Sequence, residues 1–132
     1  MTFEEIREQI QILGTLGEIP HTYLKVFPQS PQNGTPHIEV KEKSYDYVVQ
    51  ERGYEFSRQS TTDLDTLLFW VLSNAASLYA FDYESRHRKL NEDTRQQAFA
   101  ITVSIMDKIN SEWGTRTQEK ISAILIDAPY HM

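Results

Sequence analysis

Residues 38–57 read IEVKEKSYDYVVQERGYEFS, and this stretch decides the fold class. Apolar and polar residues alternate in three short runs, which is typical of strands with one buried and one solvated face. The apolar positions of the three runs are Ile38 and Val40, then Tyr45, Tyr47 and Val49, then Tyr54 and Phe56. Arg52 and Gly53 separate the second and third runs and suit a tight hairpin turn. We therefore expect an antiparallel meander whose aromatic face is buried.

The sequence before the meander begins with a predicted amphipathic helix. Thr2 and Glu5 have the spacing of a capping box, and apolar residues follow at helical intervals. Gly14 and Gly17 are expected to end this helix, because glycine accepts the left-handed conformation that often follows a helix end.

Two further segments connect this helix to the meander. Residues 21–27 suit a short strand, so the sheet is expected to contain three to four strands. Residues 28–36 contain three prolines and must form a loop, since proline removes ladder donors and breaks helices.

The sequence after the meander predicts three helices packed on one sheet face. Thr62 with Asp65 offers a second capping signature, and a wide apolar stripe follows it. Asn91 and Ser111 are expected to cap the next two helices. Strands followed by a run of helices indicate the α+β class, and 132 residues are enough for one domain over residues 1–132.

The composition bears on the cellular compartment. The chain has no cysteine, which excludes disulfides, thiolate metal sites and cysteine nucleophiles. Met1–Arg7 lacks the basic start of a signal peptide, and the longest apolar run, Leu67–Leu72, is far shorter than the roughly 20 residues that a membrane span needs. We expect a cytoplasmic protein with no membrane partner.

The net charge of −6 is unevenly distributed. Residues 1–66 hold eleven acidic and six basic side chains, whereas residues 67–132 hold eight and seven. Nucleic-acid binders usually carry a basic face, so we expect no nucleic acid partner. An acidic protein is suited to a basic partner, because complementary fields speed encounter. The same charge also serves solubility alone.

The sequence offers little catalytic or metal-binding chemistry, so we predict no enzyme activity, no metal and no cofactor. The five glycines form no phosphate-binding motif, and no nucleophile elbow or HExxH motif occurs. Glu84, His87 and Asp93 could support acid–base chemistry, although ion pairs at a helix end explain the same residues. A small enzyme or a regulatory adaptor that uses the polar segment Tyr83–Arg88 is the alternative interpretation.

Scattered residues of the C-terminal half resemble a known family. They are Thr62 to Trp70, Tyr83-Glu84, His87-Arg88, Asp93-Thr94-Arg95, Phe99, Glu112-Trp113, Arg116, Ile124-Leu125 and Pro129-Tyr130. In this order they resemble the immunity protein 63 family of bacterial polymorphic toxin systems, which include contact-dependent growth inhibition. The resemblance implies a cytoplasmic antitoxin that binds and neutralises a cognate C-terminal toxin domain. Many such domains are nucleases and therefore basic.

The polar face of the meander is the surface that we expect to meet this partner. It carries carboxylates at Glu39, Asp46 and Glu55, and Glu51 lies beside the hairpin turn. Charged side chains buried against a basic partner give fast and specific association. We therefore predict partner-binding roles for Glu39, Asp46, Glu51 and Glu55.

Overall fold

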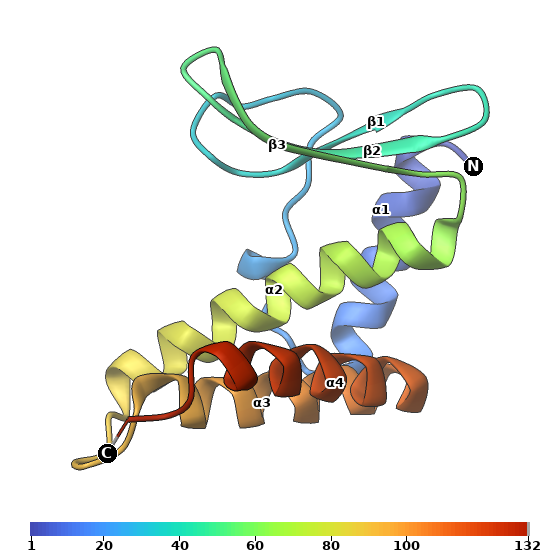
Figure 1. The fold of residues 1–132 in the computed structure, drawn as a ribbon. Coiled ribbons are helices and arrows are strands. Elements are labelled where there is room, and N and C mark those ends of the chain that lie inside the picture. Colours follow the sequence, from blue (N-terminus) through green and yellow to red (C-terminus); the bar gives the residue numbers. More distant parts are fainter. Residues whose placement is uncertain (132) are drawn as a thin grey trace.

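The computed structural model describes residues 1–131 and begins with helix α1, Phe3–Leu16 (Figure 1). The Thr2 hydroxyl accepts the amide of Glu5 at 3.2 Å, and the Glu5 carboxylate accepts the amide of Thr2 at 3.0 Å. This reciprocal pair confirms the expected capping box.

Helix α1 runs through Gly14, so the prediction that this glycine ends the helix is wrong. Gly14 is buried, and a Cβ atom added there would overlap the Leu24 side chain. The glycine therefore serves close packing. The helix ends at Gly17, whose amide donates to Leu13, but with a right-handed φ of −80°.

The prediction of a strand over residues 21–27 is also wrong. A single 3₁₀ turn, η1, covers His21–Tyr23, and Phe27 makes only an isolated parallel bridge to His37. The amide of Leu24 donates back to the carbonyl oxygen of His21. The backbone here forms a turn, so it does not have the extended conformation that pairing with a strand requires. The following loop is irregular, as expected.

The sheet is the expected antiparallel meander, in the order β1-β2-β3. Its strands are β1 (His37–Val40), β2 (Tyr45–Glu51) and β3 (Tyr54–Thr61). Arg52 and Gly53 have φ values of 51° and 80°. Two positive φ values favour the tight hairpin turn whose twist matches that of the strands, which confirms the predicted turn.

Three helices complete the fold and confirm the α+β class. They are α2 (Leu64–Arg86), α3 (Thr94–Ile109) and α4 (Ser111–Asp127). Of these three helices, α2 packs directly on the sheet, chiefly on β2, while α3 packs on α2 and α4 packs on α3 (Figure 1). Helix α1 also contacts the sheet, at β1. The helices therefore form a further layer behind α2, and they do not share the sheet face equally.

The three helix caps lie one or two residues from their predicted positions. They are Asp63, Asp93 and Asn110, where Thr62, Asn91 and Ser111 were expected. The Asp63 carboxylate accepts the amide of Thr66 at 3.1 Å and its hydroxyl at 2.6 Å. A carboxylate also suits the positive end of the helix dipole, which favours Asp63 over its threonine neighbour.

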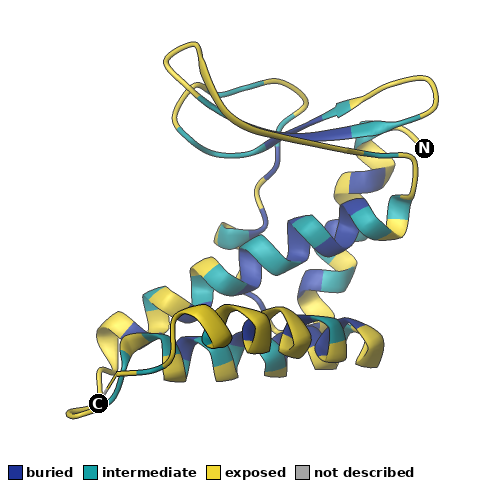
Figure 2. Ribbon diagram, in the orientation of Figure 1, coloured by how far each residue is buried: buried dark blue, intermediate teal, exposed yellow. Residues whose placement is uncertain are grey.

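Helix α2 runs through the centre of the core (Figure 2). By length and composition alone it could cross a membrane, so the shortness of the Leu67–Leu72 run is not decisive. Nine of its residues are buried against neighbouring elements, among them Phe69, Leu72 and Ala76. This central position accounts for its apolar composition.

Strand β3 is exposed along its length (Figure 2). Tyr47 of β2 is buried as predicted, but Tyr54 and Phe56 are 65% and 60% exposed. The prediction that these two aromatic residues are buried is therefore wrong. The tip of the β2–β3 hairpin rises away from the helices (Figure 1), which agrees with the exposure of both side chains.

Candidate partner-binding surface

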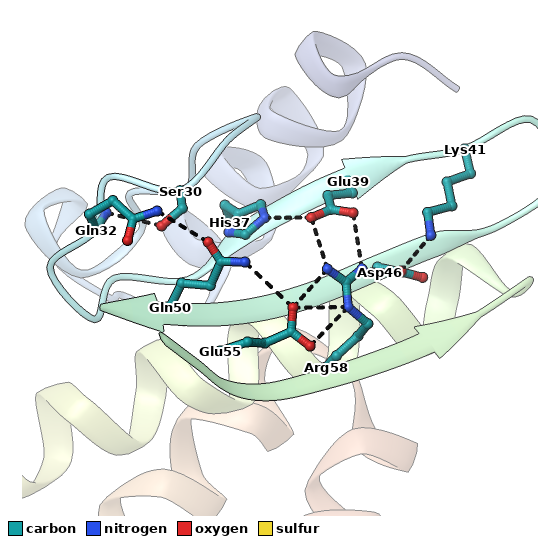
Figure 3. Close-up of polar contacts among 9 residues, drawn as sticks. All are labelled: Ser30, Gln32, His37, Glu39, Lys41, Asp46, Gln50, Glu55 and Arg58. Atoms are coloured by element: carbon teal, nitrogen blue, oxygen red, sulfur yellow. Dashed lines mark hydrogen bonds and ion pairs between the residues drawn. The ribbon is translucent and has the colours of Figure 1, made fainter. Parts of the chain in front are cut away.

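An ion-pair network built around Arg58 lies on the outer face of the sheet, which is the face turned away from α2. The Arg58 guanidinium contacts Glu39 at 3.0 Å, Glu55 at 2.9 Å and Asp46 at 2.5 Å (Figure 3). Lys41 adds a contact to Asp46 at 2.8 Å. These five side chains, from all three strands and the first turn, are called the Arg58 network below.

A β-bulge makes this network possible. Val49 pairs with Ser57, but the next residue, Gln50, pairs with Glu55, which leaves Phe56 as an inserted residue. Side chains alternate between the faces of a regular strand, so residues three apart would point in opposite directions. The inserted residue restores Glu55 to the face of Arg58 and moves Ser57 to the opposite face.

The carboxylates of the Arg58 network are stabilised in their charged form. Hydrogen bonds from Lys41, Ser60 and Arg58 lower the pKa of Asp46 to about 2, although burial acts in the opposite direction. Hydrogen bonding to Arg58 also lowers the pKa values of Glu39 and Glu55. All three groups are therefore ionised at neutral pH.

The four predicted binding residues have different surroundings. The side chains of Glu39 and Glu55 are about one-third exposed, at 32% and 39%. Asp46 is only 2% exposed and is held inside the Arg58 network. Glu51 is exposed but pairs with Tyr54, so by alternation it lies on the other face of the hairpin. The fold thus brings three of the four together and separates the fourth.

The outer face is less solvated than the alternation predicts. Val48 and His37, which share it with Asp46, are both buried. The three carboxylates face two cations, Arg58 and Lys41, which leaves an excess of one negative charge. Strict alternation from Tyr54 and Phe56 would place Arg58 on the opposite face, and the bulge brings it to this one.

The loop of residues 28–36 is tied to this surface. The Gln32 side chain donates to Gln50 at 3.2 Å, and Gln50 donates to Glu55 at 3.4 Å (Figure 3). His37 contacts Glu39 through Nε2 at 2.8 Å, while its buried Nδ1 has no hydrogen-bond partner within residues 1–131. The loop, β1 and the Arg58 network therefore form one connected polar surface.

The polar segment Tyr83–Arg88 has the contacts of a helix end. The exposed His87 ring stacks on Tyr83 at 4.0 Å and bonds the Tyr83 carbonyl at 2.9 Å. Buried Glu84 contacts Arg88 at 3.3 Å. A neighbouring groove of about 730 Å³ is lined by Tyr83 but not by Glu84 or His87, so these groups do not converge on it.

The residues that carry the family resemblance mainly hold the helices together. Arg95 donates to the carbonyl oxygens of Ala128 and Pro129 at 2.8 and 2.9 Å and pairs with Asp93 at 3.0 Å. These bonds attach the C-terminal segment to the start of α3. The indole of Trp113 meets the Phe69 ring edge to face at 5.6 Å and joins α4 to α2. These contacts join helices and the C-terminal segment, and none of them involves a residue of the Arg58 network.

The chain presents a preorganised charged sheet face on a small α+β fold. No cluster of three metal-ligating side chains occurs within residues 1–131. Over residues 42–123, more than half of its length, the chain matches immunity protein 63 and belongs to that family. No curated protein and no solved structure is significantly similar to it.

Membership of the immunity protein 63 family confirms the resemblance seen in the sequence. The match begins at residue 42 and therefore includes β2, β3, α2 and α3, together with most of α4. The family implies an immunity protein of a toxin system, which binds a cognate toxin in a role that is not enzymatic.

Proposed function

We propose that this protein is a cytoplasmic antitoxin that neutralises a basic toxin domain, a nuclease delivered by contact-dependent growth inhibition or a related system. It acts by stoichiometric binding and without catalysis. The match to immunity protein 63 over residues 42–123 is the observation that carries the proposal. The net charge of −6 supports a basic partner, because opposite charge speeds encounter.

The outer sheet face supplies the first contact in this proposal. Glu39 and Glu55 are held in place by Arg58, and about one-third of each side chain stays exposed, at 32% and 39%. Little side-chain entropy remains to be lost when such residues bind, which favours affinity. Asp46 contributes indirectly, because its buried carboxylate positions Arg58 and Lys41.

Co-expression tests the function directly. The C-terminal domain of the large effector encoded beside this gene is expressed alone and together with the wild-type chain. We expect growth arrest in the first case, and growth with co-purification in a 1:1 complex in the second. If cells still die and the two proteins do not co-purify, the proposal is wrong.

Charge reversal tests the surface. The double variant Glu39→Lys and Glu55→Lys should slow association with that toxin domain by about tenfold at low salt, as measured by stopped-flow fluorescence. The matched control reverses two exposed acids on helices, Glu8→Lys and Glu119→Lys, and changes the net charge equally. Equal association rates for the two variants would remove the outer sheet face from the interface.

A further inference from the structure

Strand β3 is an open edge of the sheet. In the order β1-β2-β3 it has a neighbour on one side only, and seven of its eight residues are exposed. On the free side, backbone N–H and C=O groups have no ladder partner, so they can pair with an added strand. The bulge at Phe56 interrupts the edge near the turn, but residues 57–61 pair with β2 in regular register. An uninterrupted run of edge backbone is therefore available.

A groove of about 380 Å³ lies beneath this edge, on the side of the sheet that faces α2. Its lining is largely polar and includes Ser57 and Gln59 of β3, Ser73, Asn74 and Ser77 of α2, and Lys120 of α4. A strand added to β3 would direct every second side chain toward this groove. Serine, amide and ammonium groups there favour polar or acidic side chains.

The hairpin end of β3 has a different character. Tyr54 and Phe56 meet edge to face at 4.8 Å and together expose an aromatic surface. Tyr54 pairs with Glu51 and therefore belongs to the groove side of the sheet. Aromatic side chains are enriched in protein interfaces, and tyrosine is among the residues that contribute most to binding.

The outer side of the same edge continues into the Arg58 network. Glu55 and Arg58 both project there from β3, and the network carries one more carboxylate than cation. An added strand would pass beside these groups with its alternate side chains. The excess negative charge favours basic side chains on that side of the strand.

We propose that an extended segment of the toxin domain binds to β3 as a fourth strand of the sheet. This inference rests on the proposed function and names the contact through which it operates. The segment carries apolar side chains opposite Tyr54 and Phe56, polar or acidic side chains toward Lys120, and basic side chains on the outer side. Backbone pairing supplies affinity, while the alternating side chains supply specificity.

Amide hydrogen exchange of the complex with the neighbouring effector's C-terminal domain tests strand addition. Binding should slow exchange of outward-facing amides in residues 57–61 by about tenfold or more, because they become hydrogen-bonded. The α4 amides provide the internal control and should exchange as in the free protein. Unchanged exchange of residues 57–61 in a formed complex would overturn the inference while leaving the antitoxin function intact.

Substitution of the aromatic pair provides the second test. Tyr54→Ala combined with Phe56→Ala should weaken toxin binding by about tenfold or more, whereas Leu90→Ala, which removes another exposed apolar side chain, should not. Wild-type affinity of the double variant would overturn the inference.

A dimer of the chain alone in which residues 57–61 are already protected would also overturn it, because a second copy would then occupy the edge. Failure of the wild-type chain to bind would overturn the antitoxin function itself.

Discussion

Helix α2 and strand β3 lie at opposite extremes of burial. Nine residues of α2 are buried, whereas every residue of β3 is exposed except the partly buried Thr61. The helix is covered by the sheet on one side and by α3 on another, while β3 forms the edge of the sheet. Buried contacts are therefore concentrated in α2, whereas the free edge and the aromatic side chains of β3 are exposed.

The difference between these elements shows that burial requires a covering layer. Tyr47 and Tyr54 lie on the same face of one hairpin, yet only Tyr47 is buried. Helix α2 lies beneath the middle of the sheet, and the hairpin tip extends beyond it (Figure 1). Residue type is the same at the two positions, so the covering element makes the difference.

The largest expected effect tests the assignment of stability to α2. Leu72→Ala should lower the free energy of unfolding by about 2–5 kcal/mol, because it removes a fully buried side chain and leaves a cavity. Leu78→Ala, in the same helix but about half exposed, should cost much less. Urea denaturation measures both changes, and equal losses would contradict the central role of the buried stripe.

The next largest expected effect is on the free energy of unfolding and concerns Arg58, a side chain of β3. Arg58→Met should lower the free energy of unfolding by about 1–3 kcal/mol, because it leaves the buried Asp46 with fewer partners. Gln59→Met, on the neighbouring position of the other face, is the control. If both variants unfold like the wild type, neither side chain stabilises the fold and the contrast with α2 becomes sharper.

The pH dependence of the free energy of unfolding tests Asp46, the member of the Arg58 network that lies on β2. Its pKa is about 2 in the folded protein and about 3.9 in an unfolded chain. Its stabilisation is therefore present above about pH 4 and is lost as the pH falls toward 2, because the unfolded chain takes up the proton first. Asp46→Asn should cost about 1.5 kcal/mol at pH 7 and clearly less at pH 2.5, as measured by denaturant unfolding at both pH values. A difference that stays constant with pH would contradict the ionised state of this carboxylate.

The smallest expected effect concerns the aromatic pair. Tyr54→Ala and Phe56→Ala should each change the free energy of unfolding by less than about 0.5 kcal/mol, since both side chains are largely exposed. Thermal unfolding followed by circular dichroism measures the change. A loss as large as that of Leu72→Ala would mean that the hairpin tip is packed in solution.

The sequence predicted the elements that depend on local interactions. The capping box of Thr2 and Glu5 acts over three residues, and the turn at Arg52 and Gly53 acts over two. Both were correct because such interactions need no distant partner. The strong apolar stripe of α2 was equally clear, although its cap was placed at Thr62 and not at Asp63.

The errors arose where distant contacts decide the outcome. Gly14 was expected to end α1, but Leu24 requires its lack of a side chain within the helix. Residues 21–27 have the composition of a strand, yet they turn instead of joining the sheet. Competing local signals of similar strength are resolved by packing, which periodicity does not describe.

The predicted binding surface shows the same division. Glu39, Asp46 and Glu55 were correctly assigned to one face, because strand alternation requires only the sequence. The inserted Phe56 then brings Arg58 to that face, and Arg58 neutralises much of their charge. The binding roles of the four acids stay a prediction, with Glu39 and Glu55 the most accessible members of the Arg58 network.

The sequence by itself determined the α+β class, the hairpin turn, the helices and the family, because these depend on short-range patterns and on residue identity. Only the tertiary structure decided which apolar residues are buried, which carboxylates are neutralised and which strand edge stays open. Each of these properties depends on the elements that pack beside a residue. In this protein, the bulge at Phe56 brings Arg58 to the outer face, and the position of β3 at the end of the sheet leaves one of its edges open.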